Sequence, residues 1–338
     1  MKVLMIGGTG RISAAVSKRA VEKGIDLYLL NRGSQNEFFP QGAKQIVADG
    51  RDETSLREAL RGQMFDVVVD WIGYLPAQAE MDIRVFEGIT KQFIYISSAS
   101  AYQKPPARFL ITEETPLENP HWQYSRDKIA CEEIFFEAHR KRGFPITVVR
   151  PSHTYGATSL PMIFPGRQSP YSVIARMKSG KPIIVPGDGN SLWVVTHNTD
   201  FAKAFVGLLG NEKAIGEAYH ITSDEVLTWD AIVQTIGRAA GFEPKLYHMA
   251  TDFITACHPE VHPELVGDKI NSVVFDNAKV KAVAPEFVCT TGLAEGAKLT
   301  LDWFDAHPAL KQRDEAWEGL CDRLIAAHEA GKVAFERS

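Results

Sequence analysis

The chain has 338 residues, of which 45% are apolar and 23% are charged, and its formal net charge is −5. This is the composition of an ordinary globular protein, long enough for a sizeable core and a second, smaller lobe. Acidic and basic residues are mixed along the sequence, without the basic block that follows nucleic-acid phosphates, so we expect no nucleic-acid partner.

Cysteine usage and hydropathy favour a cytoplasmic protein. Cys131, Cys257, Cys289 and Cys321 lie far apart and form no Cys-x-x-Cys pair, so we expect reduced thiols, with Cys131 buried in a helix. The opening "MKVLMIGGTG" is interrupted by glycine too early for a signal peptide. No stretch reaches the ~18 apolar residues of a membrane helix, so no membrane span is expected.

Up to residue 156, short apolar runs alternate with amphipathic stretches such as 11–23 and 53–62. The runs are apolar throughout, as in strands buried on both faces of a parallel sheet. The pattern predicts an α/β fold, a Rossmann-type doubly wound parallel sheet over residues 1–156. The runs are "KVLMIGG", "DLYLLNR", "KQIVAD", "FDVVVDWIG", "QFIYISSAS" and "ITVVRPS".

After residue 156 the texture changes. Residues 157–170 are rich in proline, glycine and serine and predict a long loop. Residues 196–225 are expected to return to the first domain, while 157–195 and 226–338 form a smaller C-terminal α/β substrate lobe. "KPIIVPGDGNSLWVVTHNTD" predicts two short strands around a Gly-Asp-Gly turn. The remaining predicted elements are helices at 171–180, 199–210, 228–240, 251–256 and 311–331 and a strand at 218–222.

The stretch "MIGGTGRIS" joins the first predicted strand to the first helix. Glycines at this junction let the backbone turn tightly and approach a pyrophosphate held by the N–H groups of the helix start. Ser13 replaces the third glycine of the usual fingerprint, a small change where helix and strand pack closely. A plain β–α turn is the alternative interpretation. The predicted cofactor contacts here are Gly7, Thr9, Gly10, Arg11 and Ile12.

Three further strand ends bear on the cofactor. The second strand ends in Asn31 and Arg32 instead of an acidic residue, and an arginine near the ribose suits a 2′-phosphate, so NADP is favoured over NAD. Arg32 facing solvent is the alternative. Asp49, with Gly50 beside it, either accepts from the adenine amino group or caps the next helix. Gly73 ends the fourth strand, where a side chain would crowd the cofactor.

"QYSRDK" places Tyr124 one helical turn before Lys128, and alone this pair is also compatible with a solvated helix face. Free tyrosine has a pKa near ~10, and a nearby ammonium together with an oxidised nicotinamide favours the phenolate. The pair therefore has the chemistry of an acid/base group with a cation beside it.

Taken in order, the motifs of this sequence resemble the extended short-chain dehydrogenase/reductases of the NAD-dependent epimerase/dehydratase type. They are "GGTGRIS", "FIYISSASAY", "YSRDK", "RPSHTYG", "PGDGNS", "THNTDFAKA", "YHITSDEVLTWDAI" and "FDNAKVKA". The resemblance implies that Tyr124 is the general acid/base, that Lys128 holds the nicotinamide ribose, and that Ser98 bonds the reacting oxygen. Ser97 and Ser100 are the other candidates for the serine. A homodimer is also implied.

The family comparison narrows the reaction. Its sugar dehydratases and decarboxylases carry carboxylates after the catalytic serine or threonine, where this chain has Ala99 and Ser100. Epimerisation or simple dehydrogenation/reduction of a sugar, nucleotide sugar or related hydroxy/keto compound remains. A non-catalytic NAD(P)-binding sensor or an RNA-binding relative of the same fold is the alternative.

The substrate contacts are less defined. His153 stands where many relatives have an asparagine near the nucleotide-sugar phosphates, and a structural histidine is the alternative. The family's "Arg-Asp-Phe-Val-His" stretch, whose arginine grips the diphosphate, reads "SLWVVTH" here, so Arg167 or Arg176 would have to substitute. The predicted substrate contacts are Ser98, Ser100, Tyr124 and His153. "CHPEVHPE" has histidines at helical spacing, but its prolines break the helix, so no metal is expected.

Overall fold

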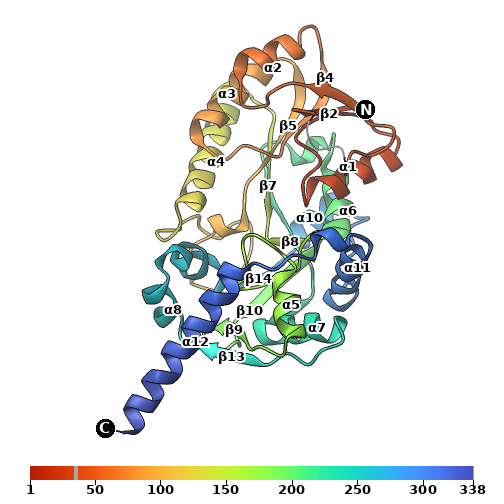
Figure 1. Cartoon of the computed structure of the whole chain (residues 1–338). Coiled ribbons are helices and arrows are strands. Elements are labelled where there is room, and N and C mark those ends of the chain that lie inside the picture. The colour runs from red at the N-terminus through yellow and green to blue at the C-terminus, as the bar shows by residue number, and fades with distance from the viewer. Residues whose placement is uncertain (34–36, 338) are drawn as a thin grey trace.

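The computed structural model describes residues 1–33 and 37–337. Its larger part is built on a seven-stranded parallel sheet, drawn in the upper half of Figure 1, and the smaller part lies below it. In spatial order the strands are β3-β2-β1-β4-β5-β7-β11, so the order reverses between β1 and β4. The strand bounds are β1 Lys2–Ile6, β2 Asp26–Asn31, β3 Lys44–Val47, β4 Phe65–Asp70, β5 Thr90–Ile96, β7 Ile146–Pro151 and β11 Ala218–Ile221.

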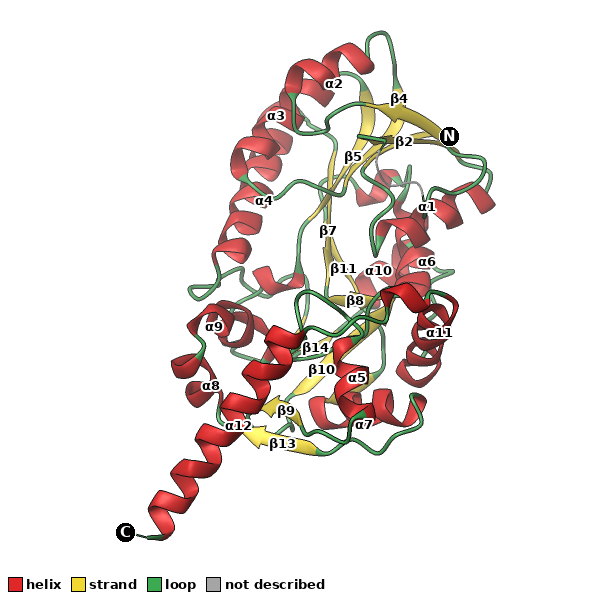
Figure 2. Ribbon diagram, viewed as in Figure 1, coloured by secondary structure: helices red, strands yellow, loops and turns green. Residues whose placement is uncertain are grey.

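Helices cover both faces of this sheet, as Figure 2 shows. Alternate residues of β1 point to opposite sides: Val3 and Met5 belong to one buried cluster, and Leu4 and Ile6 to another. The first cluster includes residues of α1, α6 and α10, and the second includes residues of α2, α3 and α4. This double burial confirms the predicted doubly wound fold. The bounds are α1 Ser13–Glu22, α2 Glu53–Ala59, α3 Pro76–Phe86, α4 Gln123–Arg142, α6 Asn198–Leu208 and α10 Ala278–Val283.

One predicted strand differs from the expectation of burial on both faces. β3 lies at the edge of the sheet, and Val47 is 67% exposed. In this sheet β3 pairs with one neighbouring strand, β2. An apolar run in an edge strand can therefore have the same composition as one in a central strand, and the strand order of the sheet distinguishes them.

The smaller part has its own core, and its strands form three short sheets. The predicted pair of strands around the Gly-Asp-Gly turn exists, but β9 (Ile183–Pro186) pairs with β13 (Leu246–Met249), whereas β10 (Leu192–His197) pairs with β8 and β12. The chain leaves the large sheet directly after β7, because the next strand, β8 (His153–Tyr155), belongs to a small sheet of the lobe. The remaining strands are β6 Leu110–Ile111, β12 Val226–Thr228 and β14 Val274–Phe275.

Helices surround these small sheets, and residues 157–170 contain no helix or extended strand, as expected. The last helix, α12, packs its first half on the lobe and extends away from it, as Figure 1 shows. Within the described residues, no helix is both long and apolar enough to cross a membrane. The helix bounds are α5 Ser172–Lys178, α7 Trp229–Ala239, α8 Thr251–Cys257, α9 His262–Glu264, α11 Leu293–Ala306 and α12 Glu315–Glu336.

Candidate active site

A cleft of about 740 Å³ opens at the carboxyl ends of the strands, at the point where the strand order reverses. The loop between β1 and α1 forms its floor, and Gly7 and Gly8 have positive φ values of 96° and 99°. A Cβ on Gly8 would lie 2.7 Å from the Leu29 side chain. These glycines are therefore required by the close packing of the loop as well as by its turn. Thr9, Gly10, Arg11 and Ile12 also line the cleft.

Ser13, the departure from the glycine fingerprint, has a structural role that the sequence did not predict. It is the first residue of α1 and is 4% exposed. Its Oγ accepts a hydrogen bond of 2.9 Å from the Gly10 N–H. The serine hydroxyl thus fixes the loop from within, which a glycine at this position would not do.

The ends of β2 and β3 shape the far end of the cleft. Asn31 Oδ1 accepts from the Gly33 N–H at 2.9 Å, while its Nδ2 is buried with no partner among the described residues. Arg32 and Arg11 both line the cleft and are exposed. This end offers an unpaired amide donor and two guanidinium groups, and no carboxylate at the end of β2.

Asp49 lines the cleft but does not cap the following helix. The cap of α2 is Asp52, whose carboxylate accepts from the Ser55 N–H at 2.6 Å. Asp49 instead accepts from the Arg51 N–H at 2.9 Å, so the capping alternative is wrong. Gly50 is required because a Cβ there would lie 2.5 Å from Ile6.

At Gly73 the structure shows a reason for glycine that the sequence did not predict. Gly73 does not line the cleft, and a Cβ there would meet the Asp70 carboxylate at 2.2 Å and the Tyr95 ring at 3.2 Å. Its carbonyl oxygen accepts a 2.6 Å hydrogen bond from Lys128 Nζ. Gly73 therefore serves the site by holding Lys128.

Lys128 is 2% exposed and lines the cofactor cleft. Its Nζ also donates to the Ile96 carbonyl at 2.7 Å and lies over the rings of Tyr74, Tyr95 and Tyr124. Burial lowers its pKa to about 8, and the nearby Asp70 opposes that shift. Two of its three N–H groups are thus occupied by backbone, and the third remains for the cleft.

Behind Lys128 lies a buried group of charges that the sequence did not reveal. Arg51 pairs with Asp70 at 2.6 Å and approaches Asp82 at 3.6 Å. Burial, followed by the neighbouring Asp70, raises the pKa of Asp82 well above its usual value. Asp82 is therefore held neutral, and near the ammonium of Lys128 the carboxylate of Asp70 is opposed by the guanidinium of Arg51.

Tyr124 lies at the start of α4, beside the Trp122 ring at a centroid separation of 4.9 Å. Burial raises its pKa to about 12, and a hydrogen bond with Ser98 acts in the opposite direction. Ser98 Oγ lies 2.9 Å from Ser100 Oγ, which in turn accepts from Ser125 Oγ at 2.8 Å. Ser98 is thus the serine in contact with Tyr124, and Ser100 positions it.

A second cavity of about 260 Å³ joins the cofactor cleft at Ser98, Tyr124, Pro151 and Ser152, which line both. Ala99, Ser100 and His153 also line it. Burial lowers the pKa of His153 well below its usual value, with the charge of Lys269 acting in the same direction. His153 is therefore a neutral group facing the cavity.

The lobe adds charged residues to this cavity that sequence reasoning missed. Glu264, Asp268 and Lys269 line it, together with the rings of Trp122, Trp193 and Phe275. Asp268 and Lys269 lie in a turn of π-helix, Leu265–Lys269. Glu264 is the last residue of "CHPEVHPE", and Asp268 and Lys269 follow it with no motif of their own. Around Pro259 and Pro263 the helix breaks as predicted, and the described residues contain no cluster of metal ligands.

Neither arginine suggested as a diphosphate ligand enters the cavity. Arg176 is fully buried and donates to the Pro182 carbonyl at 2.7 Å while pairing with Asp322 of α12 at 2.8 Å. Arg167 is 68% exposed and lies 3.9 Å from Glu264. Arg176 anchors the last helix, so the expectation of a substrate role for it is wrong.

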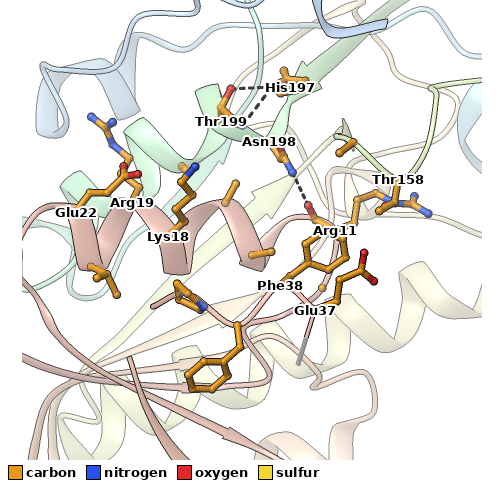
Figure 3. Close-up of a pocket in the computed structure, with 18 of the residues that line it drawn as sticks. Arg11, Lys18, Arg19, Glu22, Glu37, Phe38, Thr158, His197, Asn198 and Thr199 are labelled. Atoms are coloured by element: carbon orange, nitrogen blue, oxygen red, sulfur yellow. Dashed lines mark hydrogen bonds between the residues drawn. The ribbon is translucent and has the colours of Figure 1, made fainter. Parts of the chain in front are cut away.

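A further hollow of about 810 Å³ lies on the outer side of the glycine loop, between α1, α6, α11 and residues 37–41 (Figure 3). It shares Gly10 and Arg11 with the cofactor cleft. Asn198 Nδ2 donates to the Arg11 carbonyl at 2.7 Å and ties the start of α6 to that loop. Tyr124 and Ser98 do not line this hollow, so it is separate from the acid/base pair.

The fold, with a glycine loop at the sheet switch point and a tyrosine–lysine helix beside it, is that of a nucleotide-dependent short-chain dehydrogenase/reductase. Residues 3–222 match the NAD dependent epimerase/dehydratase family, and the chain belongs to that family.

Named relatives vary widely in activity. The chain is 29% identical to the chloroplast stem-loop binding protein of 41 kDa b from Arabidopsis thaliana, over 73% of this chain and 65% of that one. It is 24% identical to 2'-dehydrokanamycin reductase from Streptomyces kanamyceticus, over 71% and 67%. The chain thus spans about two thirds of these relatives.

Solved structures share the fold over almost the whole chain. The epimerase Mth375 from Methanothermobacter thermautotrophicus superimposes with a TM-score of 0.75 at 16% identity, over 92% of this chain and 94% of that one. UDP-glucuronic acid 4-epimerase from Bacillus cereus, in complex with NAD, gives 0.72 at 18%, over 90% and 99%. At these identities the likeness shows the fold alone.

The cleft of this chain fits the dinucleotide that its family uses. Asn31 Nδ2 and Ser97 Oγ are buried with no partner within residues 1–33 and 37–337. Both atoms belong to residues that line the cleft. Unpaired buried polar atoms are costly unless a ligand satisfies them.

Proposed function

We propose that the protein is an NAD(P)-dependent dehydrogenase/reductase or epimerase acting on a hydroxyl or ketone of a sugar-like compound. The observation that carries the proposal is the position of the Tyr124–Ser98 pair, where the cofactor cleft and the substrate cavity meet. A substrate in the small cavity would place its reacting oxygen against this pair, and a nicotinamide in the cleft would lie next to the same carbon.

In this proposal Tyr124 moves the proton at the substrate oxygen, and Ser98 donates a hydrogen bond to that oxygen. The bound nicotinamide supplies or accepts the hydride. Lys128 holds the ribose through its remaining N–H and favours the phenolate of Tyr124 by its charge. Ser100 positions Ser98, and its carbonyl accepts from Asn119 Nδ2 at 2.9 Å.

Replacing Tyr124 by Phe tests the acid/base assignment. Turnover should fall by about 10²–10⁴-fold while cofactor binding is retained, because only the proton-moving hydroxyl is lost. A Tyr171→Phe variant, altered far from the cleft, controls for a general effect. Unchanged turnover in Tyr124→Phe would defeat the assignment.

The pH dependence should follow the protonation state of Tyr124. Oxidation of a hydroxyl needs the phenolate, so its kcat/KM should rise about tenfold per pH unit below the pKa of Tyr124. Reduction needs the phenol and should stay level over the same range. Rate profiles in both directions between about pH 6 and 8, where Lys128 keeps its charge, check this. A falling oxidation limb across that range contradicts the assignment.

Epimerase and reductase versions differ in what happens to the cofactor. An epimerase returns the hydride, whereas a reductase consumes one nicotinamide per turnover, so absorbance of the reduced cofactor distinguishes them. The relative named as a reductase supports the second version. The absence of a carboxylate at Ala99 and Ser100 continues to argue against dehydration at that position, although Asp268 now enters the cavity from the lobe.

A second candidate is RNA binding, favoured by the stem-loop binding relative. The net charge of −5 opposes it, because binding to phosphates depends on released counterions and basic side chains. A gel-shift titration with a stem-loop RNA at two salt concentrations tests it, and salt-sensitive binding would support this candidate.

A homodimer and a cytoplasmic location remain proposals. The outer surfaces of α3 and α4, the expected dimer face, expose charged side chains: Glu80, Arg84, Glu133, Glu137 and Arg140. Any dimer through this face would be polar, and light scattering that gives a monomeric mass would refute it.

A further inference from the structure

Among the described residues that line the substrate cavity, the lysine, Lys269, is already paired with a carboxylate. Lys269 Nζ, 8% exposed, donates to Glu264 Oε1 at 2.5 Å and lies 3.3 and 3.5 Å from the carbonyl oxygens of Met162 and Ile163. Its three N–H groups are all used by these oxygens. Lys269 therefore neutralises its own surroundings and has no donor left for a phosphate.

The other lysine near the cavity is used in the same way. Lys104, 3% exposed, pairs with Asp268 Oδ1 at 3.1 Å and does not itself line the cavity. Arg176 pairs with Asp322 of α12, and His153 is neutral. Among the described lining residues, the carboxylate oxygen with spare capacity is Asp268 Oδ2, and the unpaired donor Trp193 Nε1 is neutral. Glu264 Oε2 lies 3.9 Å from the exposed guanidinium of Arg167.

The volume of the substrate cavity and its aromatic walls also favour a small ring compound. The cavity is about 260 Å³, below the range of roughly 300–1,000 Å³ typical of sites for drug-sized ligands. Trp122, Trp193 and Phe275 supply flat apolar walls, and Trp193 is itself stacked on Trp229 at 5.3 Å. Such walls suit the faces of a saturated ring, whose hydroxyl edges meet the polar groups between them.

We propose that the substrate is a compact, phosphate-free ring compound whose hydroxyl or ammonium groups donate to Asp268 and Glu264. This inference rests on the proposed function and narrows its substrate class. A nucleoside diphosphate would place two negative charges beside two carboxylates. The nearby Lys104 and Lys269 are already paired with those carboxylates, and Arg167 does not line the cavity. The carboxylate oxygens reject it and accept neutral or cationic donors.

The deciding experiment is calorimetric titration of UDP and UDP-glucose into the protein saturated with NADP⁺. We expect no binding tighter than about 1 mM. A dissociation constant below about 100 µM for either compound would overturn the inference, whatever the enzyme turns over. NADP⁺ binding in the same samples confirms that the protein is folded and loaded.

A parallel assay compares unphosphorylated hexoses, inositol and amino sugars with the corresponding UDP-sugars. Nicotinamide absorbance reports oxidation or reduction, and chromatography of the sugars reports epimerisation. Turnover confined to the phosphate-free set supports the inference, and turnover of a UDP-sugar overturns it. If neither set reacts although cofactor binds, the proposed function is contradicted, while the UDP titration still decides the substrate class.

Asp268→Asn then tests the recognition in the best phosphate-free compound of that panel. KM should rise about tenfold or more, while NADPH affinity stays unchanged, because one charge-assisted acceptor is lost. Asp302→Asn, on the exposed side of α11, is the matched control. An unchanged KM in Asp268→Asn contradicts the role of this carboxylate, and its thermal melting shows whether Lys104 still packs.

Discussion

The cofactor cleft and the substrate cavity meet at Tyr124, but they are assembled differently. The cleft is made by residues that follow strand ends of one sheet, in loops of a few residues each. The cavity combines residues from α4, from the segment after β7, and from the 264–275 region of the lobe. The cofactor cleft is thus formed by repeated strand–loop units, whereas the substrate cavity forms only when distant segments of the chain pack together.

The charges differ in the same manner. At the far end of the cofactor cleft, Arg11 and Arg32 are exposed and available to a ligand. In and beside the substrate cavity, Lys269 and Lys104 are buried and already paired with carboxylates. A family can therefore keep one cofactor while its lobe changes which charges the substrate meets. Variants that affect one region and spare the other would establish this separation.

Lys128 lines the cofactor cleft beside Tyr124, where the two regions meet, so its replacement should have the largest effect of the three variants that follow. Lys128→Met removes the charge beside Tyr124 and two backbone contacts, and kcat/KM should fall by about 10²–10³-fold. Cofactor titration measures the loss of cofactor affinity, and steady-state rates measure the loss of kcat/KM. Lys298→Met on exposed α11 is the control. Wild-type rates in Lys128→Met would show that the two regions are not coupled there.

Gly8→Ala tests the cofactor region by itself. The added Cβ would meet Leu29 at 2.7 Å in a backbone with φ of 99°, so the free energy of unfolding should fall by about 1–3 kcal/mol. Gly241→Ala has a similar φ of 82° with open space around it, so it isolates the conformational part. Equal losses in chemical denaturation of the two variants would remove the packing argument.

The smallest expected effect concerns cofactor choice. Arg32→Ala should weaken NADPH binding about tenfold and leave NADH binding unchanged, because only the 2′-phosphate needs the guanidinium. Fluorescence titration with each cofactor measures it, and the substrate KM should not move. If wild-type protein prefers NADH, the proposed NADP preference falls and Arg32 is a solvent-facing charge.

Much of the fold was predictable from the sequence because apolar runs and helical periods repeat in a regular order. The main error concerns β3, whose apolar letters suggested burial although it lies at a sheet edge. Pairing partners in the lobe were also out of reach. β9 and β10 are neighbours in sequence, but each pairs with a distant strand, and such choices depend on packing.

The site was predictable only where its residues belong to one local motif. Ser98, Tyr124 and Lys128 are brought together as expected, although their roles remain proposals. For Asp49 the capping alternative is wrong, because Asp52 caps the helix, and the adenine contact stays a prediction. At Gly73 the neighbour that a side chain would meet is Asp70, which the sequence did not indicate. The Asp268 and Lys269 contributions had no sequence signal, because their spacing acquires meaning only when the lobe folds.

The π-helical turn at Leu265–Lys269 has a consequence for how this enzyme changes over generations. Such turns hold one residue more than an α-helix would, and they concentrate at functional positions. Deleting a single residue there would rewind the segment and turn Asp268 by roughly 100° away from its present direction. A length change too small to disturb the sheet would then exchange the carboxylate of the cavity for another side chain, so new substrates become accessible through insertion and deletion as well as substitution.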